Sequence, residues 1–130
     1  MAIQVNYLDN GFGSEMVASD IVTGEEIIKA LKEIYNDQHL NKLKYRIIDR
    51  TNCTEYRVYP EEIEKIADMD DKASIINPNL MIAVISTTSL QHGMTSMWQS
   101  YLKNNVFITK NFPDRISADK WIKSYIEINK

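Results

Sequence analysis

Polar side chains that could do chemistry gather in three segments, and each follows an apolar run that suits a strand. The first segment is 49–54 (DRTNCT), the second is 86–89 (STTS) and the third is the pair 110–111 (KN). A carboxylate can act as a nucleophile or bind a metal, and hydroxyls beside a helix N-terminus can hold a phosphate or a carboxylate. We therefore predict a ligand-binding site formed by five of these residues, namely Asp49, Thr51, Ser86, Thr87 and Lys110.

The same residues also have a structural interpretation. Serine and threonine favour helix caps because they bond nearby backbone amides, and we favour this interpretation for 86–89. A single carboxylate at a strand end, such as Asp49, commonly orders its own loop. Histidine can serve as a general base, but nothing in the sequence joins His92 to a nucleophile. Cys53 would be reactive only if a cation such as Arg50 lowered its pKa. No catalytic residue is predicted.

Common catalytic motifs are absent from the sequence. It contains no G-x-S-x-G, no P-loop, no G-x-G-x-x-G and no H-E-x-x-H. With one cysteine and two histidines it can form neither an internal disulfide nor a multi-cysteine zinc site. We therefore expect no cofactor and no metal, and we lean against catalysis, although an enzyme of unrecognised type stays open.

Charge and hydropathy narrow the choice of partners. The formal net charge is -3, and nucleic-acid binding or a polybasic membrane contact would need a basic face. No apolar run approaches the roughly 20 residues that span a bilayer. The first residues, MAIQV, lack the pattern of a signal peptide. We expect one domain over 1–130, located in the cytoplasm, without nucleic acid and without membrane insertion.

Periodicity predicts the elements that position the three segments. Apolar residues alternate over 3–7, and 9–11 (DNG) suits a turn before a return strand over 15–22. Thr23 and Glu26 form a capping box before the first helix. Further strands are predicted at 45–49, 80–85 and 106–109, and further helices start at Pro60, near Leu90 and at a Ser117 cap. The order ββαβαβαβα predicts an α/β fold with a mixed, mostly parallel sheet and packed helices. The polar segments then meet at the carboxyl edge of the sheet.

Two helical segments carry further hypotheses. The stripe that includes Leu90 is core in most proteins, but part of it can form a subunit interface, for which the candidates are Met94, Met97, Trp98 and Tyr101. The charge-rich segment 68–72 (DMDDK) is interpreted as a solvated helix face.

Several of these segments, taken in order, resemble a family. YRIID at 45–49 and VYPEE at 58–62 look like the strand–loop–helix unit of STAS-like (SpoIIAA-like) proteins. LMIAVI at 80–85 followed by HGM and MW, and the closing ADKWI, are similar to a group of small bacterial SpoIIAA-like proteins. The resemblance covers roughly residues 24–126 and implies a STAS-like fold and a homodimer; it supplies no catalytic residue. The phosphorylated Asp-Ser pair of the anti-sigma-factor antagonists on this fold is replaced here by Asp49-Arg50-Thr51, so that switch is not transferred.

Three functions are compatible with these patterns. The first is a non-enzymatic regulatory or protein-interaction module acting as a homodimer. The second is a protein that binds a small anionic or lipid-like ligand through the strand-end loops. A remote third is a degenerate receiver domain, because Asp49, Thr87 and Lys110 close three successive strands; it lacks the acidic pair that would hold Mg²⁺ and the first crossover helix.

Overall fold

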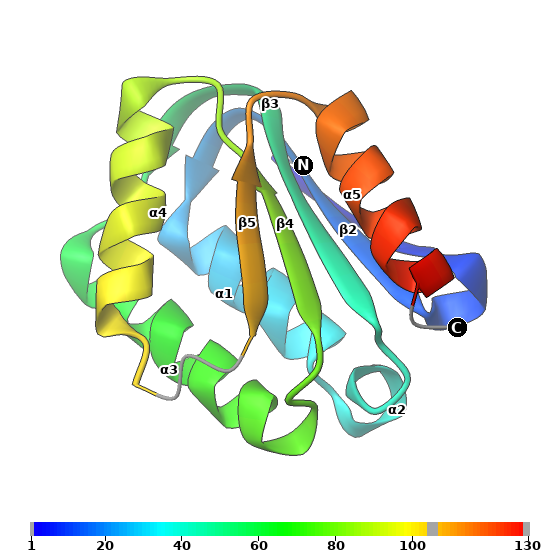
Figure 1. Cartoon of the computed structure of the whole chain (residues 1–130). Coiled ribbons are helices and arrows are strands. Elements are labelled where there is room, and N and C mark those ends of the chain that lie inside the picture. The colour runs from blue at the N-terminus through cyan, green and yellow to red at the C-terminus, as the bar shows by residue number, and fades with distance from the viewer. Residues whose placement is uncertain (1, 104–106, 129–130) are drawn as a thin grey trace.

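Five strands form one sheet whose spatial order follows the chain (Figure 1). The computed structural model describes residues 2–103 and 107–128. The strands are β1 (Ile3–Leu8), β2 (Gly13–Thr23), β3 (Tyr45–Arg57), β4 (Met81–Ile85) and β5 (Ile108–Phe112). β1 pairs with β2 in antiparallel fashion, and all later pairs are parallel. The predicted α/β class with a mixed, mostly parallel sheet is confirmed.

Helices cover both faces of this sheet. The helices are α1 (Gly24–Ile34), the short α2 (Asp37–Leu40), α3 (Pro60–Ile76), α4 (Ser89–Tyr101) and α5 (Arg115–Ile128). Figure 1 shows α1, α3 and α4 on one face and α5 on the other. Three crossovers of the same hand, each stepping to the next strand in the same direction, place their helices on one face. α5 follows the last strand and covers the opposite face.

Local signals in the sequence form the opening hairpin and the first helix as predicted. Asp9, Asn10 and Gly11 have positive φ angles of 51°, 57° and 91°, which lets the chain reverse between β1 and β2. The Glu26 amide donates to the Thr23 hydroxyl at 3.3 Å, and the Thr23 amide donates back to the Glu26 carboxylate at 3.2 Å. This reciprocal pair satisfies amides that α1 leaves open at its start.

Apolar side chains form two clusters, one on each face of the sheet. The larger lies under α1, α3 and α4, and the smaller lies under α5 with Ile47, Met81 and Ile85 from the strands and Ala118 and Ile122 from the helix. Every residue of β4 is buried, as the apolar run at 80–85 predicted. β3 lies between β2 and β4, and the two clusters therefore cover it on both faces.

The strands extend further than the sequence indicated. The polar segment 50–54 was predicted as a loop, but it continues β3 to Arg57, because β2 is longer than β4 and keeps pairing with β3 beyond the end of β4. Polar residues fit there since that part of the strand is partly exposed. The 110–111 pair likewise lies inside β5, not in a loop. Val106, the predicted start of that strand, lies outside the described residues.

Three helical predictions also need correction. Ser117 does not cap α5; its amide donates to Asp114 at 2.8 Å, so Asp114 fills that role. Leu90 is 55% exposed, because the buried face of α4 runs through Gln91, Thr95 and Trp98 instead. The segment 68–72 is not wholly solvated, since Asp70 is only 2% exposed and Asp71 is also buried. The cause is that α3 packs against both α1 and α4, which covers more of its circumference.

Candidate functional site

The predicted site residues lie on different faces of the sheet. Asp49 points toward α5, where its carboxylate lies 3.1 Å from Arg115 and accepts the Thr51 hydroxyl at 2.6 Å and the Thr51 amide at 3.0 Å. Burial alone would raise the pKa of Asp49, but these hydrogen bonds and the guanidinium outweigh it and lower the pKa. Asp49 and Thr51 are therefore engaged with each other and with α5.

Arg115 joins the charges on this face into one cluster. Its guanidinium lies 2.6 Å from Glu15 and 2.9 Å from Asp119, in addition to Asp49. Burial lowers the pKa of Arg115, yet the hydrogen bonds to the three carboxylates raise it overall. Each charge in this cluster has an opposite partner.

Ser86 and Thr87 lie between β4 and α4, where the loop is organised by helix capping. The Thr88 hydroxyl accepts the Gln91 amide at 3.2 Å, and the Gln91 side chain accepts the Thr87 amide at 2.8 Å. Ser86 is fully buried and bonded to Arg50. These contacts match the structural interpretation of 86–89.

Lys110 is exposed on β5, with its Nζ 5.6 Å from the centre of the Phe112 ring. In the described part of the chain, no hydrogen bond or ion pair links Lys110 with Asp49 or Thr87. The described contacts therefore do not join the five predicted ligand-binding residues into one cluster, and the receiver interpretation gains no contact that supports it.

Cys53 and His92, the other two residues considered for chemistry, also contact neighbouring groups. The Cys53 thiol is buried, and burial raises its pKa more than the Glu55 backbone and Arg50 lower it. The His92 ring lies 2.8 Å from the Asn111 side chain. The four predicted interface residues differ in burial. Trp98 is buried in the core, whereas Met94, Met97 and Tyr101 are partly buried against it.

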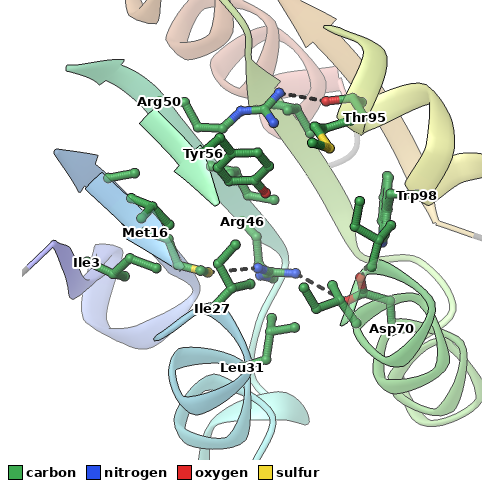
Figure 2. Close-up of a pocket in the computed structure, with 17 residues that line it drawn as sticks. Ile3, Met16, Ile27, Leu31, Arg46, Arg50, Tyr56, Asp70, Thr95 and Trp98 are labelled. Atoms are coloured by element: carbon green, nitrogen blue, oxygen red, sulfur yellow. Dashed lines mark hydrogen bonds and ion pairs between the residues drawn. The ribbon is translucent and has the colours of Figure 1, made fainter. Parts of the chain in front are cut away.

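A cavity of about 70 Å³ lies inside the larger apolar cluster, between the sheet and the helices α1, α3 and α4. Its walls are mostly aliphatic and aromatic, with Met16, Ile27, Leu31, Ile66 and Trp98 among them (Figure 2). Two arginines from β3, Arg46 and Arg50, also line it. This combination of an apolar wall and buried guanidiniums is unusual, because buried charges are expensive unless they are paired.

Arg46 is 1% exposed and incompletely satisfied. Its Nη1 donates to the Tyr35 hydroxyl at 2.5 Å and lies 3.5 Å from the Asp70 carboxylate. Among the described residues, its Nη2 donates a hydrogen bond only to the Met16 sulfur, at 3.2 Å, and a thioether is a weak acceptor. Its Nε has no hydrogen-bond partner among the described residues. One edge of this guanidinium thus lacks a strong acceptor.

Asp70 is the counter-charge of Arg46. Its two oxygens accept the Tyr35 hydroxyl at 2.6 Å and the Trp98 indole N–H at 2.7 Å. Burial raises the pKa of Asp70, against the opposing effect of Arg46 and of both hydrogen bonds. Both oxygens of this carboxyl group therefore have a hydrogen-bond donor.

Arg50 is held by neutral groups. It donates to the Ile85 carbonyl at 3.2 Å, to the Thr95 hydroxyl at 2.6 Å and to the Ser86 hydroxyl. Its guanidinium also lies 5.4 Å from the centre of the Tyr56 ring, which Figure 2 shows between the two arginines. Among the described residues no carboxylate forms an ion pair with it. Burial lowers the pKa of Arg50, which reflects the cost of an unneutralised charge.

Sequence reasoning missed this site, although a signal for it exists. Arg46 and Arg50 flank Ile48 at a spacing of two along a strand, so all three side chains point to the same face. A central strand of a parallel sheet is covered on both faces. Arginines at alternate positions in such a strand must therefore be buried.

The wall of the cavity combines many apolar side chains with a few polar ones. In the described part of the chain, no cluster of three or more His, Cys, Asp or Glu residues could hold a metal ion. None of the described helices is both long enough and apolar enough to span a bilayer.

Comparison with known proteins finds no family model, curated protein or solved structure that matches this chain.

Proposed function

We propose that this protein is a non-enzymatic binding module that takes a small organic molecule into the cavity between the sheet and α1, α3 and α4. The observation that carries the proposal is the Nε of Arg46, a buried donor without a partner beside an apolar cavity. Buried polar groups nearly always find a partner, and an unpaired one costs about 1–3 kcal/mol or more. A bound molecule would supply the missing acceptor.

The composition of the cavity wall supports the same function. Small-molecule sites are concave and mostly apolar, with a few polar groups that fix the orientation of the ligand. Here the apolar wall includes residues from β2, α1, α3 and α4, and the polar groups come from β3, α3 and α4. This cavity differs from the predicted strand-end site, in which the segment 86–89 is organised by helix capping.

We propose a STAS-like fold for the module. Its support is the resemblance of the segments between 24 and 126, together with the order of a hairpin, the helices α1 and α2, and then three βα units. A regulatory or protein-interaction role as a homodimer stays a prediction, as does the cytoplasmic location.

Native mass spectrometry of gently purified protein tests the proposed function. We expect part of the protein population to carry an added mass, and this added mass should disappear when the protein is denatured. The same spectrum also gives the number of chains in the complex. Ala18→Val, which adds two methyl groups at a residue of the cavity wall, should abolish the added mass. Ala2→Val makes the same change outside the cavity and should retain it. An added mass that persists in Ala18→Val would place the ligand elsewhere and overturn the proposal.

A further inference from the structure

The charges that line the cavity are unbalanced. Of the described residues in its wall, only Arg46, Arg50 and Asp70 carry a formal charge. Asp70 pairs with Arg46 at 3.5 Å, and Arg50 has only neutral acceptors. Within the cavity wall one positive charge therefore has no carboxylate partner, and all three residues are at most 3% exposed. Asp71, which is also buried on α3, accepts the Lys103 amide and does not line the cavity. An uncompensated buried charge is strongly unfavourable, and a bound anion of charge -1 would remove the imbalance.

The free edge of Arg46 indicates the shape of that anion. The Nε–H and one Nη2–H of a guanidinium point in parallel along one edge and match the two oxygens of a carboxylate. On Arg46 this Nε is unpaired and this Nη2 meets only the Met16 thioether. Figure 2 shows the Arg46 guanidinium between Met16 and Asp70, with Ile27 and Leu31 nearby. A carboxylate at this edge would replace a weak acceptor with a strong one.

The size of the cavity limits the chain that the carboxylate can carry. The cavity volume of about 70 Å³ is roughly half that of an engineered apolar cavity of about 150 Å³ that binds benzene. The space suits a carboxylate with a few carbons, and the apolar wall beside Met16 favours an unsubstituted chain. A dianion such as phosphate would exceed the available positive charge, and a neutral analogue would leave Arg50 unbalanced.

We infer that the ligand is a small monocarboxylic acid, bound as its anion by the Nε–Nη2 edge of Arg46 with Arg50 as the balancing charge. This inference rests on the proposed function and adds the chemical class of the ligand. The Met16 side chain is flexible and moves aside for the carboxylate.

Sodium butyrate, butyramide and sodium phosphate at matched ionic strength distinguish the alternatives. The measurement is a titration followed by the arginine Nε–H signals of ¹⁵N-labelled protein. Arg46→Lys assigns the Arg46 signal; if this variant does not fold, the Ala18→Val variant identifies the signals that report on the cavity. We expect butyrate to shift the Arg46 signal saturably and to bind roughly tenfold or more tightly than butyramide. Ala18→Val should weaken butyrate binding by about the same factor, and Ala2→Val should not change it.

Each of the other possible results of the titration contradicts one step of the inference. Equal binding of butyramide would overturn the inference about charge and leave the proposed function standing. Tighter binding of phosphate would also overturn it, in favour of an inorganic or phosphorylated ligand. If none of the three binds and the Nε–H exchanges rapidly with solvent, water satisfies the donor, and both the inference and the proposed function fail.

Discussion

β3 carries charged residues on both of its faces, and the two faces accommodate them in opposite ways. Toward α5, Asp49 belongs to a cluster in which Arg115 meets three carboxylates. Toward the cavity, Asp70 pairs with Arg46, and Arg50 has no carboxylate partner among the described residues. The outer cluster is partly exposed, with 31% of the Arg115 side chain in contact with solvent, while the inner groups are almost wholly buried.

The two faces differ in how their charged groups are paired. The outer cluster joins β2, β3 and α5, and each of its carboxylates contacts Arg115. On the inner face, the Arg46 Nε has no acceptor among the described residues. A surplus of donors has little structural benefit in a core, since well-packed apolar residues of similar volume would be equally stable or more stable. The inner face is therefore the one on which to test binding.

The largest expected effect is on the inner face, from Asp70→Ala. Removal of the carboxylate leaves Arg46 without its counter-charge and Trp98 without its acceptor, so the free energy of unfolding should fall by about 3–5 kcal/mol. Urea denaturation measures it. Asp68→Ala, which removes an exposed partner of Lys72 on the same helix, should cost no more than about 0.5 kcal/mol. Equal losses in the two variants would contradict the inner network.

A smaller loss is expected from Trp98→Phe. The ring packing is largely kept, but the indole N–H that binds Asp70 is lost, and a hydrogen bond to a charged group is worth about 1.5–3 kcal/mol. Trp121→Phe under α5 is the matched control, because the described contacts of Trp121 are with the rings of Phe112 and Tyr125. Thermal or urea unfolding should show the greater loss for Trp98→Phe; the reverse order would assign Asp70 another main donor.

On the outer face, Arg115→Ala should cost about 1 kcal/mol, because partly exposed ion pairs are individually weak. The loss should shrink in about 1 M salt, where the screening length is about 3 Å. Arg57→Ala provides the baseline, because the exposed Arg57 side chain forms an ion pair with nearby Glu55. A loss that is insensitive to salt would show that Arg115 acts through packing rather than charge.

The smallest expected effect is the dependence of the free energy of unfolding on pH, and its sign is opposite for the two faces of β3. The pKa of Asp49 is lowered in the folded protein, so its contribution to stability is present above the usual aspartate pKa and is lost as pH falls through the lowered value. Burial raises the pKa of Asp70. The pH-dependent part of its effect on stability therefore favours the folded state at low pH and is lost as pH rises through the raised pKa. Asp49→Asn should flatten the acid side of a plot of unfolding free energy against pH. An unchanged slope would contradict the role of Thr51 and Arg115.

Local signals predicted much of this fold, and tertiary context decided the rest. The capping box at Thr23, the DNG turn and the apolar run at 80–85 each act within a few residues, so the sequence reveals them. The extension of β3 to Arg57 depends on the length of β2, which pairs with it from a distance. The burial of Asp70 depends on two neighbouring helices. For the same reason the strand-end site was predicted from sequence adjacency, whereas the cavity unites residues from β3, α3 and α4.

The order of the strands has a consequence for how the molecule is made. Each strand pairs with the one that precedes it in the chain, so the sheet can grow during synthesis by addition at one edge, with each new strand finding its template already in place. The face that α5 covers is different. Ile47, Met81 and Ile85 stay open to water until the 14 residues of α5 have left the ribosome and folded back. The nascent chain is then most prone to aggregate just before its last helix emerges.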